Sequence, residues 1–276
     1  MNNAAHTVNE EAAATAFSKQ APLFDALYSP DTIIQYKRKR VRDHILQWLQ
    51  PGSHILELNA GTGEDAVFFA QKGHTVHATD ISDEMQKLLM EKARQQGLQN
   101  NITTELRSYT DLENLSFKGP YDFIFSNFAG LNCTNELSGV LRSFDSLLKQ
   151  GGIVTMVILP KFCLWEFLLL FKGKFKTGFR RFSGRKGTKA HIEGEYFPCW
   201  YYNPSFIQKH LKNSFDMIGL EGLCTIAPPS YLQGFAEKYP KTYEWLIKKE
   251  NKWKAKWPWK TIGDYYITTL RKKGGH

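Results

Sequence analysis

The sequence predicts an α/β fold, a mostly parallel sheet of seven strands with helices on both faces. Two observations support this prediction. From residue 51 onward, short apolar runs alternate with longer segments whose apolar residues recur at helical spacing. The first apolar run, residues 55–58, leads through a small-residue turn at 59–63 into a helical segment that begins at Glu64. A strand, a glycine turn and a helix in this order open a nucleotide-binding βαβ unit.

The order of the elements follows from the same patterns. We expect strands at residues 55–58, 75–79, 102–106, 123–126, 153–159, 217–225 and 264–270. Helices are expected at residues 32–49, 64–72, 83–96, 136–148 and 204–212, with Ser82 and Asn203 as the N-caps of the third and the fifth. Residues 1–20 are polar and rich in alanine, and we expect a flexible arm or a loosely docked helix there.

Composition limits the class of protein. The four cysteines, at positions 133, 163, 199 and 224, include no Cys-x-x-Cys pair, which disfavours a zinc site or a disulfide framework. The first 20 residues have no apolar signal core, and the longest apolar run, residues 162–171, is far shorter than the roughly 20 residues that span a bilayer. We therefore expect a cytoplasmic protein, with peripheral association at a membrane as an option.

Two acidic residues next to the glycine turn indicate the kind of ligand. Asp80 ends the second strand, where a carboxylate can accept hydrogen bonds from ribose hydroxyls. Dinucleotide sites carry a third glycine inside the helix, whereas this chain has Ala66. Glu57 places another acid at the turn, which suits a cationic ligand better than a pyrophosphate. S-adenosylmethionine has an ammonium, a sulfonium and no phosphate, so these residues favour it over NAD.

Four successive motifs extend this interpretation. They begin at Glu57 (Glu-Leu-Asn-Ala-Gly-Thr-Gly), at Ala78 (Ala-Thr-Asp-Ile-Ser), at Tyr121 (Tyr-Asp-Phe-Ile-Phe-Ser) and at Leu148 (Leu-Lys-Gln-Gly-Gly-Ile-Val). In this order and spacing they resemble the motifs of class I S-adenosylmethionine-dependent methyltransferases, over about residues 50–160. Asn59 stands where that family usually has its first glycine, and asparagine tolerates a left-handed backbone better than most residues.

The resemblance implies a Rossmann-like sheet whose last strand is antiparallel, and S-adenosylmethionine as cofactor. By resemblance, Asp80 would hold the ribose, Met85 would lie against the adenine, and Asp111 with the Leu112 N–H would bind the adenine amino group. Asn127 and Phe128 would face the transferable methyl group. The cofactor residues expected on this basis are Glu57, Asn59, Gly61, Gly63, Asp80, Ile81, Met85, Asp111, Leu112 and Asn127.

The same resemblance suggests how the chain is divided. Residues 1–50 would form an N-terminal helical cap, in which residues 22–28 cover the cofactor, and residues 51–160 the cofactor-binding core. Residues 161–202 would be a substrate lid inserted after the fifth strand. Residues 203–276 would complete the core, with a second lid insertion at 228–260 after the sixth strand.

The acceptor site is less defined by the sequence. Methyl transfer from a sulfonium is an in-line displacement that needs alignment and exclusion of water, and no metal. An oxygen or nitrogen acceptor still has to lose a proton, for which His191, Glu193 and Glu195 in the lid are candidates, His191 first. The candidate acceptor contacts are Tyr28, Phe128, Tyr196, Trp200, Tyr201 and Tyr202, although the last four could equally pack the lid on the core.

A basic run at residues 172–189 is interleaved with Phe175, Phe179 and Phe182 and follows an apolar segment. Contact with an anionic membrane or amphiphile through residues 162–189 is our first interpretation, an anionic small molecule the second and nucleic acid the third. Asn127 is followed by phenylalanine and not by Pro-Pro, which argues against methylation of a nucleobase or a glutamine.

These observations together predict a methyltransferase that acts on the oxygen or nitrogen of a small or amphiphilic acceptor, aromatic or lipid-like. An RNA methyltransferase and a non-catalytic Rossmann-like binding protein are the alternatives. The sequence predicts no oligomeric state.

Overall fold

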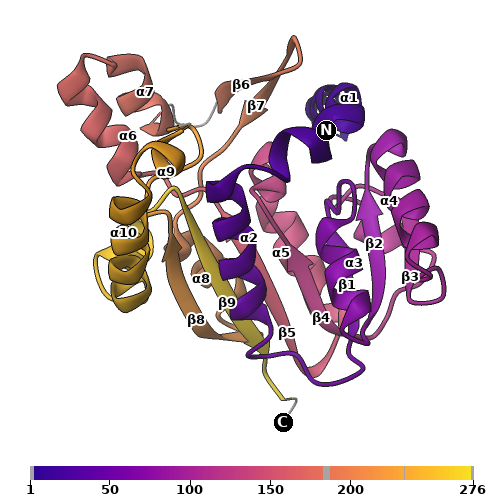
Figure 1. Ribbon diagram of the computed structural model, residues 1–276. Helices are drawn as coiled ribbons and strands as arrows, with labels where there is room; N and C mark the ends of the chain where they lie inside the picture. The colour runs from indigo at the N-terminus through magenta and orange to yellow at the C-terminus, as the bar shows by residue number, and fades with distance from the viewer. Residues whose placement is uncertain (1–2, 183–186, 233, 275–276) are drawn as a thin grey trace.

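The computed structural model describes residues 3–182, 187–232 and 234–274, with side chains from residue 10 onward. Its main sheet has seven strands in the order β3-β2-β1-β4-β5-β9-β8 (Figure 1). The strands are β1 (His54–Leu58), β2 (Thr75–Asp80), β3 (Ile102–Leu106), β4 (Tyr121–Ser126), β5 (Leu148–Ile158), β8 (Phe215–Leu223) and β9 (Tyr265–Lys272). The first five pair in parallel, and β9 runs antiparallel to β5 and β8. The predicted fold class is therefore confirmed, including the antiparallel last strand.

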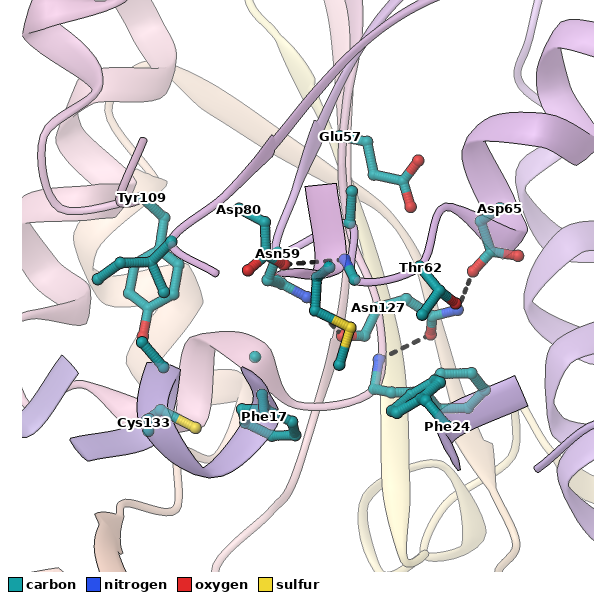
Figure 2. A pocket seen from close by; sticks show the side chains of 18 of the residues that line it. Phe17, Phe24, Glu57, Asn59, Thr62, Asp65, Asp80, Tyr109, Asn127 and Cys133 are labelled. Carbon is teal, nitrogen blue, oxygen red and sulfur yellow. Dashed lines mark hydrogen bonds between the residues drawn. The ribbon is translucent and has the colours of Figure 1, made fainter. Parts of the chain in front are cut away.

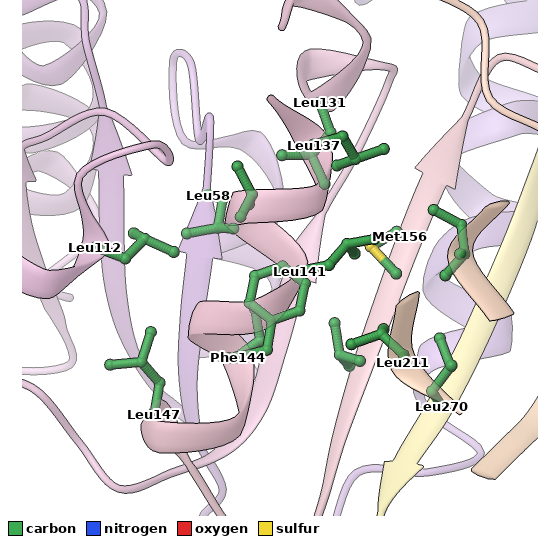
Figure 3. Close-up of a cluster of buried hydrophobic side chains, with 14 of the residues drawn as sticks. Leu58, Leu112, Leu131, Leu137, Leu141, Phe144, Leu147, Met156, Leu211 and Leu270 are labelled. Atoms are coloured by element: carbon green, nitrogen blue, oxygen red, sulfur yellow. The ribbon is translucent and has the colours of Figure 1, made fainter. Parts of the chain in front are cut away.

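Helices cover both faces of this sheet. One face carries α2 (Thr32–Ile45), α3 (Glu64–Gln71) and α4 (Asp83–Gln95), which bury Val41, Phe69 and Leu89. The other face carries α5 (Leu137–Leu147) and α8 (Pro204–Leu211), and Figure 3 shows Leu141 and Phe144 of α5 packed in the cluster on that face. Because successive strand residues point to opposite faces, neighbouring residues of β1 contribute to both clusters.

The helix ends follow local hydrogen bonds. The Ser82 hydroxyl accepts a hydrogen bond from the Met85 N–H, as predicted for an N-cap. Asn203 is the N-cap residue of α8, as predicted, but its side chain makes no capping hydrogen bond and instead accepts from the Lys161 N–H. The helix expected at 32–49 ends at Ile45, and its Asp31 cap, which accepts from the Ile34 N–H, is an addition to the prediction.

The N-terminal segment forms one helix, α1 (Asn3–Tyr28), which continues through Pro22. It lies beside the hairpin of β6 (Thr188–Ile192) and β7 (Glu195–Cys199), near the carboxyl ends of the parallel strands (Figure 1). Ala13 and Ala16 of α1 pack in a small cluster with Phe197 of β7 and with Cys133. The hairpin therefore packs against α1 and helps to hold it in place.

The two insertions form a helical region next to β8. After β5 come α6 (Leu164–Leu168), η3 (Leu169–Lys172), α7 (Phe175–Phe179) and η4 (Arg180–Phe182); after β8 come α9 (Phe235–Lys238), α10 (Pro240–Trp253) and η6 (Trp259–Thr261). The Trp165 indole N–H donates to the carbonyl of Ala227 at 3.1 Å and joins the two. Within the described residues, no helix is both long and apolar enough to cross a membrane. The lid role and the domain boundaries stay predictions.

Candidate functional site

A pocket lies where β1, β2 and β4 end, with α1 across it (Figure 2). The space between its walls, together with solvent at the open mouth, is about 920 Å³. Ligands of open α/β sheets bind at the carboxyl ends of the strands, so the pocket has the position that the fold predicts.

The turn after β1 forms the floor of this pocket. Asn59, Gly61 and Gly63 all have positive φ, at 48°, 56° and 78°. The Asn59 side chain accepts from the Ser126 hydroxyl at 2.6 Å and donates to the carbonyl of Asn127 at 3.0 Å. Asn59 thus adopts the left-handed backbone that the turn requires, and its side chain joins the end of β1 to the end of β4.

Asp80 links the tip of β2 to the same turn. Its carboxylate accepts hydrogen bonds from the backbone N–H groups of Gly61 at 2.8 Å and Ser82 at 2.9 Å. Burial raises the pKa of this carboxyl group, and the backbone hydrogen bonds oppose the shift. The carboxylate is therefore fixed in position on the pocket wall.

Glu57 is the least compensated acid of the site. Its side chain is buried, and Oε2 has no hydrogen-bond partner among the described residues. Burial first, and then the nearby charge of Asp65, raise the pKa of Glu57 well above its usual range, against the influence of Arg42 and Arg38. Asp65, in contrast, accepts from the Arg42 Nε at 2.6 Å and the Asn127 Nδ2 at 2.7 Å. A cation bound in the pocket would therefore find Glu57 available.

Helix α1 closes the pocket with apolar side chains and is held by polar contacts at the rim. Phe17 and Phe24 face the pocket from α1 (Figure 2). The Ser108 hydroxyl donates to Glu10 at 2.7 Å, and the Thr62 hydroxyl donates to Asp25, also at 2.7 Å. The cover is thus bonded to the loops after β3 and β1.

Comparison with known proteins places this site in a family. Residues 55–152 match the family model of a methyltransferase domain. This segment is therefore a methyltransferase domain. The matched segment contains the turn, Asp80 and Asn127, and it confirms the predicted family.

Curated relatives of this methyltransferase domain are distant and are matched in part. The chain is 28% identical over 149 residues to malonyl-[acyl-carrier protein] O-methyltransferase of Hamiltonella defensa, covering 54% of this chain and 52% of the relative. It is 34% identical over 109 residues to the ubiquinone/menaquinone biosynthesis C-methyltransferase of a Shewanella species, covering 37% of this chain and 41% of the relative. An uncharacterised protein of Methanocaldococcus jannaschii is 29% identical over 182 residues, 65% of each chain. The matches thus span about half of each relative.

Solved structures support the methyltransferase fold over most of the chain. A SAM-dependent methyltransferase from Methanosarcina mazei has a TM-score of 0.57 and 18% identity, over 84% of this chain and 98% of that one. The 1,6-didemethyltoxoflavin-N1-methyltransferase of Burkholderia thailandensis has a TM-score of 0.54 and 13% identity, over 95% and 88% of the two chains.

Most residues expected at the cofactor do line the pocket. They are Glu57, Asn59, Gly61, Asp80, Ile81, Met85 and Asn127, together with Phe128 from the acceptor set. Gly63 instead precedes α3 in a left-handed conformation, and a Cβ at this position would lie 2.3 Å from the Leu89 side chain. Their roles toward the cofactor stay predictions.

The predicted adenine contacts are displaced along the loop after β3. Asp111 faces away from the pocket, since it accepts from Arg107 and from Asn114, both at 2.6 Å. Leu112 is buried in the apolar core. Ser108 and Tyr109 line the pocket in their place, and their position directly after the end of β3 was the signal for them.

The acceptor residues expected in the lid do not line this pocket. His191 is exposed on the hairpin and stacks on Tyr196 with ring centroids 4.5 Å apart, which argues against a role as base. Glu193 is exposed as well, and Glu195 pairs with Lys19. Trp200 and Tyr202 belong to the core, Tyr201 lines a separate cavity, and Tyr28 packs on Phe24 of its own helix.

The basic run divides into two parts. Lys172, Lys174 and Lys176 are exposed. Arg180 and Arg181 both bind the buried carboxylate of Glu166, and Arg181 also binds Asp264 at 2.7 Å. Arg181 therefore occupies the centre of the group formed by Cys163, Glu166 and Asp264, whose oxygen and sulfur atoms lie within 4.8 Å of one another. Arg185 and Lys186 lie outside the described residues.

Proposed function

We propose that this protein is an S-adenosylmethionine-dependent methyltransferase that acts on a small or amphiphilic acceptor. The observation that carries the proposal is the buried carboxyl group of Glu57, whose Oε2 has no hydrogen-bond partner among the described residues, in a pocket of the methyltransferase domain. S-adenosylmethionine supplies an activated methyl group and an ammonium that Glu57 can bind. Phe17 and Phe24 line the pocket and would shield the methyl group from water, and Asp80 stands at the tip of β2, where a ribose would lie.

A calorimetric titration with S-adenosylmethionine, S-adenosylhomocysteine and NADH tests this proposal. We expect micromolar binding of the first two ligands and none of NADH. Asp80→Ala should weaken binding of S-adenosylhomocysteine by about 1–3 kcal/mol, because it removes a charged hydrogen-bond acceptor. Asp83→Ala, in an exposed residue that pairs with Lys87 on α4, is the control and should bind like the wild type. Absence of binding by the folded wild-type protein would refute the function.

The structure also bears on the alternatives. Binding of an RNA backbone needs free cations, and the engagement of Arg180 and Arg181 by Glu166 leaves mainly the exposed Lys172, Lys174 and Lys176 for it within the described part of the run. A non-catalytic binding protein is the second alternative, and a methyl-transfer assay with an acceptor library would separate it from an enzyme.

Peripheral contact with an anionic membrane is part of our proposal. Phe171, Phe175, Phe179 and Phe182 are each more than half exposed, on the same helical region as Lys172, Lys174 and Lys176. Aromatic side chains that enter the headgroup region, beside lysines that meet anionic lipids, are typical of interfacial segments. The region would bring the protein to an amphiphilic acceptor.

Vesicle co-sedimentation measures this contact. We expect binding to vesicles with 30% phosphatidylglycerol in phosphatidylcholine to weaken about tenfold in the double variant Phe171→Glu, Phe175→Glu, because two charges enter the apolar surface. Met90→Glu, an exposed apolar residue of α4 at the other end of the sheet, should change little. Equal binding of the wild type and the double variant would contradict the membrane proposal.

A further inference from the structure

Helix α2 carries five basic residues within positions 37–42, and four of them form ion pairs with acidic residues. Ion pairs join Arg38 to Glu64, Lys39 to Asp43, Arg40 to Glu221 and Glu250, and Arg42 to Asp65. The exception is Lys37. Its side chain is only 4% exposed, and it forms no ion pair with any carboxylate in the described part of the chain.

The contacts of the Lys37 ammonium are weak for a buried charge. Nζ donates to the hydroxyl of Ser230 at 3.0 Å, and it lies 5.5 Å from the ring centre of Phe128 and 5.0 Å from that of Tyr265. An ammonium has three N–H donors, and burial of a charge is costly unless it is paired and hydrogen-bonded. Two aromatic faces and one neutral hydroxyl compensate this cost in part. The remaining donors are available to an anion.

The contacts of Lys37 line two cavities, although Lys37 itself is in the lining of neither. Phe128 lines the pocket of the methyltransferase domain, whereas Ser230 and Tyr265 line a second, open cavity beyond the end of β5. The rings of Phe128 and Tyr265 lie 6.2 Å apart and form the wall between the two. Lys189 also lines the second cavity, whereas the charges of Arg180 and Asp264 in its wall are paired with Glu166 and Arg181.

The backbone at this wall is strained. Phe128 and Ala129 have φ values of 44° and 64°, which non-glycine residues rarely adopt, and two such residues are adjacent here. Strain of this kind concentrates at functional sites, where the surrounding structure holds it. The loop after β4 thus keeps the Phe128 ring beside the Lys37 ammonium. On the pocket side of the same ring lies Arg38, whose buried Nε has no partner among the described residues.

We propose that the second cavity is the acceptor site and that Lys37 binds an anionic group of the acceptor, a carboxylate or a phosphate. The inference rests on the proposed function, because the acceptor must reach the cofactor pocket past Phe128. A charged group held by Lys37 would fix the orientation of an acceptor whose remaining body contacts Tyr201, Tyr231 and Tyr265.

Calorimetric titrations with benzoate and phenyl phosphate, and with benzyl alcohol as the neutral probe, test the proposal. They are run on the protein with and without S-adenosylhomocysteine. We expect both anions to bind at least about tenfold more tightly than benzyl alcohol, because only the anions can form a hydrogen bond with opposite charges to the Lys37 ammonium. The stronger of the two anions identifies the carboxylate or the phosphate as the preferred group.

Lys37→Met removes the charge and keeps the length of the side chain. It should weaken both anions at least about tenfold and leave benzyl alcohol and S-adenosylhomocysteine unchanged within about twofold. Lys39→Met, two residues along α2 and exposed beside Asp43, is the matched control and should bind all probes like the wild type.

Thermal unfolding separates a binding role from a structural one. Because Lys37→Met removes a poorly compensated buried charge, we expect it to raise the Tm of the ligand-free protein by about 2–4 °C. A lysine that served the fold would give a lower Tm on substitution. The proposal is overturned if the anions show no preference over benzyl alcohol, or if Lys37→Met binds them like the wild type. Failure of S-adenosylhomocysteine to bind the wild type would count against the methyltransferase function alone, since the anion titrations do not depend on it.

Discussion

Replacement of Glu250 by alanine is expected to lower the free energy of unfolding by about 3–5 kcal/mol, because it leaves a buried cation and several buried donors without their acceptor. The Glu250 side chain is fully buried in α10. Its carboxylate accepts from the Tyr36 hydroxyl at 3.0 Å, from Arg40 at 3.3 Å and from the four consecutive backbone N–H groups of residues 224–227 at 2.8–2.9 Å. One side chain thereby joins α2, the segment after β8 and the second insertion.

Urea denaturation of the purified variants measures this effect. Glu244→Ala changes an exposed glutamate on the same helix and should stay within about 0.5 kcal/mol of the wild type. Glu250→Gln keeps the shape of the side chain and should fall between the two, since an amide oxygen accepts some of the hydrogen bonds without the charge. A loss below about 1 kcal/mol for Glu250→Ala would show that water replaces the carboxylate, and that the insertion is less firmly attached than its contacts indicate.

The parts of the fold that the sequence predicted are those with local causes. Strand and helix periodicity, the Ser82 cap and the glycine turn each depend on residues a few positions apart. The βαβ pattern then orders the strands and brings their carboxyl ends together. The sequence therefore predicts that Glu57, Asp80 and Asn127 lie close together, and they line one pocket. Asn59 adopts its left-handed backbone for the reason that the sequence offered.

The parts that failed depend on partners distant in the chain. Arg180 and Arg181 look like surface charge in the sequence, and only the fold brings them to Glu166, 14 and 15 positions away. His191 lies on a hairpin whose direction is set by packing on α1, which no motif of the core specifies. Asp111 and Leu112 lie outside the pocket, which Ser108 and Tyr109 line, because the course of the loop after β3 depends on contacts that the strand pattern does not specify. The motifs of the core therefore do not predict the positions of residues in the insertions, which depend on how the insertions pack on the core.

Substitution of Glu57 by glutamine is expected to weaken binding of S-adenosylhomocysteine by about 3 kcal/mol, on the order of 100-fold, and to remove part of its pH dependence. The ligand has an α-ammonium group, and the buried carboxyl group of Glu57 is available to it because Oε2 has no partner within the described residues. Asp65 cannot take this role as readily, since Arg42 and Asn127 already bind both of its oxygens.

The sign of the pH effect follows from the direction of the pKa shift. Burial, and then Asp65, raise the pKa of Glu57 in the free protein, so protonated Glu57 persists above its ordinary range. A bound cation favours the ionised form and lowers that pKa, so binding releases a proton and tightens as pH rises through the raised pKa of the free protein. Near pH 8 and above, the ligand amine loses its own proton and affinity should fall again.

Calorimetry in two buffers of different ionisation enthalpy counts the protons released on binding. The wild type should release a fraction of a proton at pH values below the raised pKa of Glu57, whereas Glu57→Gln should release none from this site. Glu113→Gln, in a residue exposed at η1 (Leu112–Asn114) outside the pocket, is the control and should titrate like the wild type. Identical proton release by the wild type and Glu57→Gln would mean that the ligand ammonium is bound elsewhere. Since Asp65 is already paired, such a result would indicate that the backbone carbonyls of the turn bind the ammonium. Glu57 would then have no contact with the ligand.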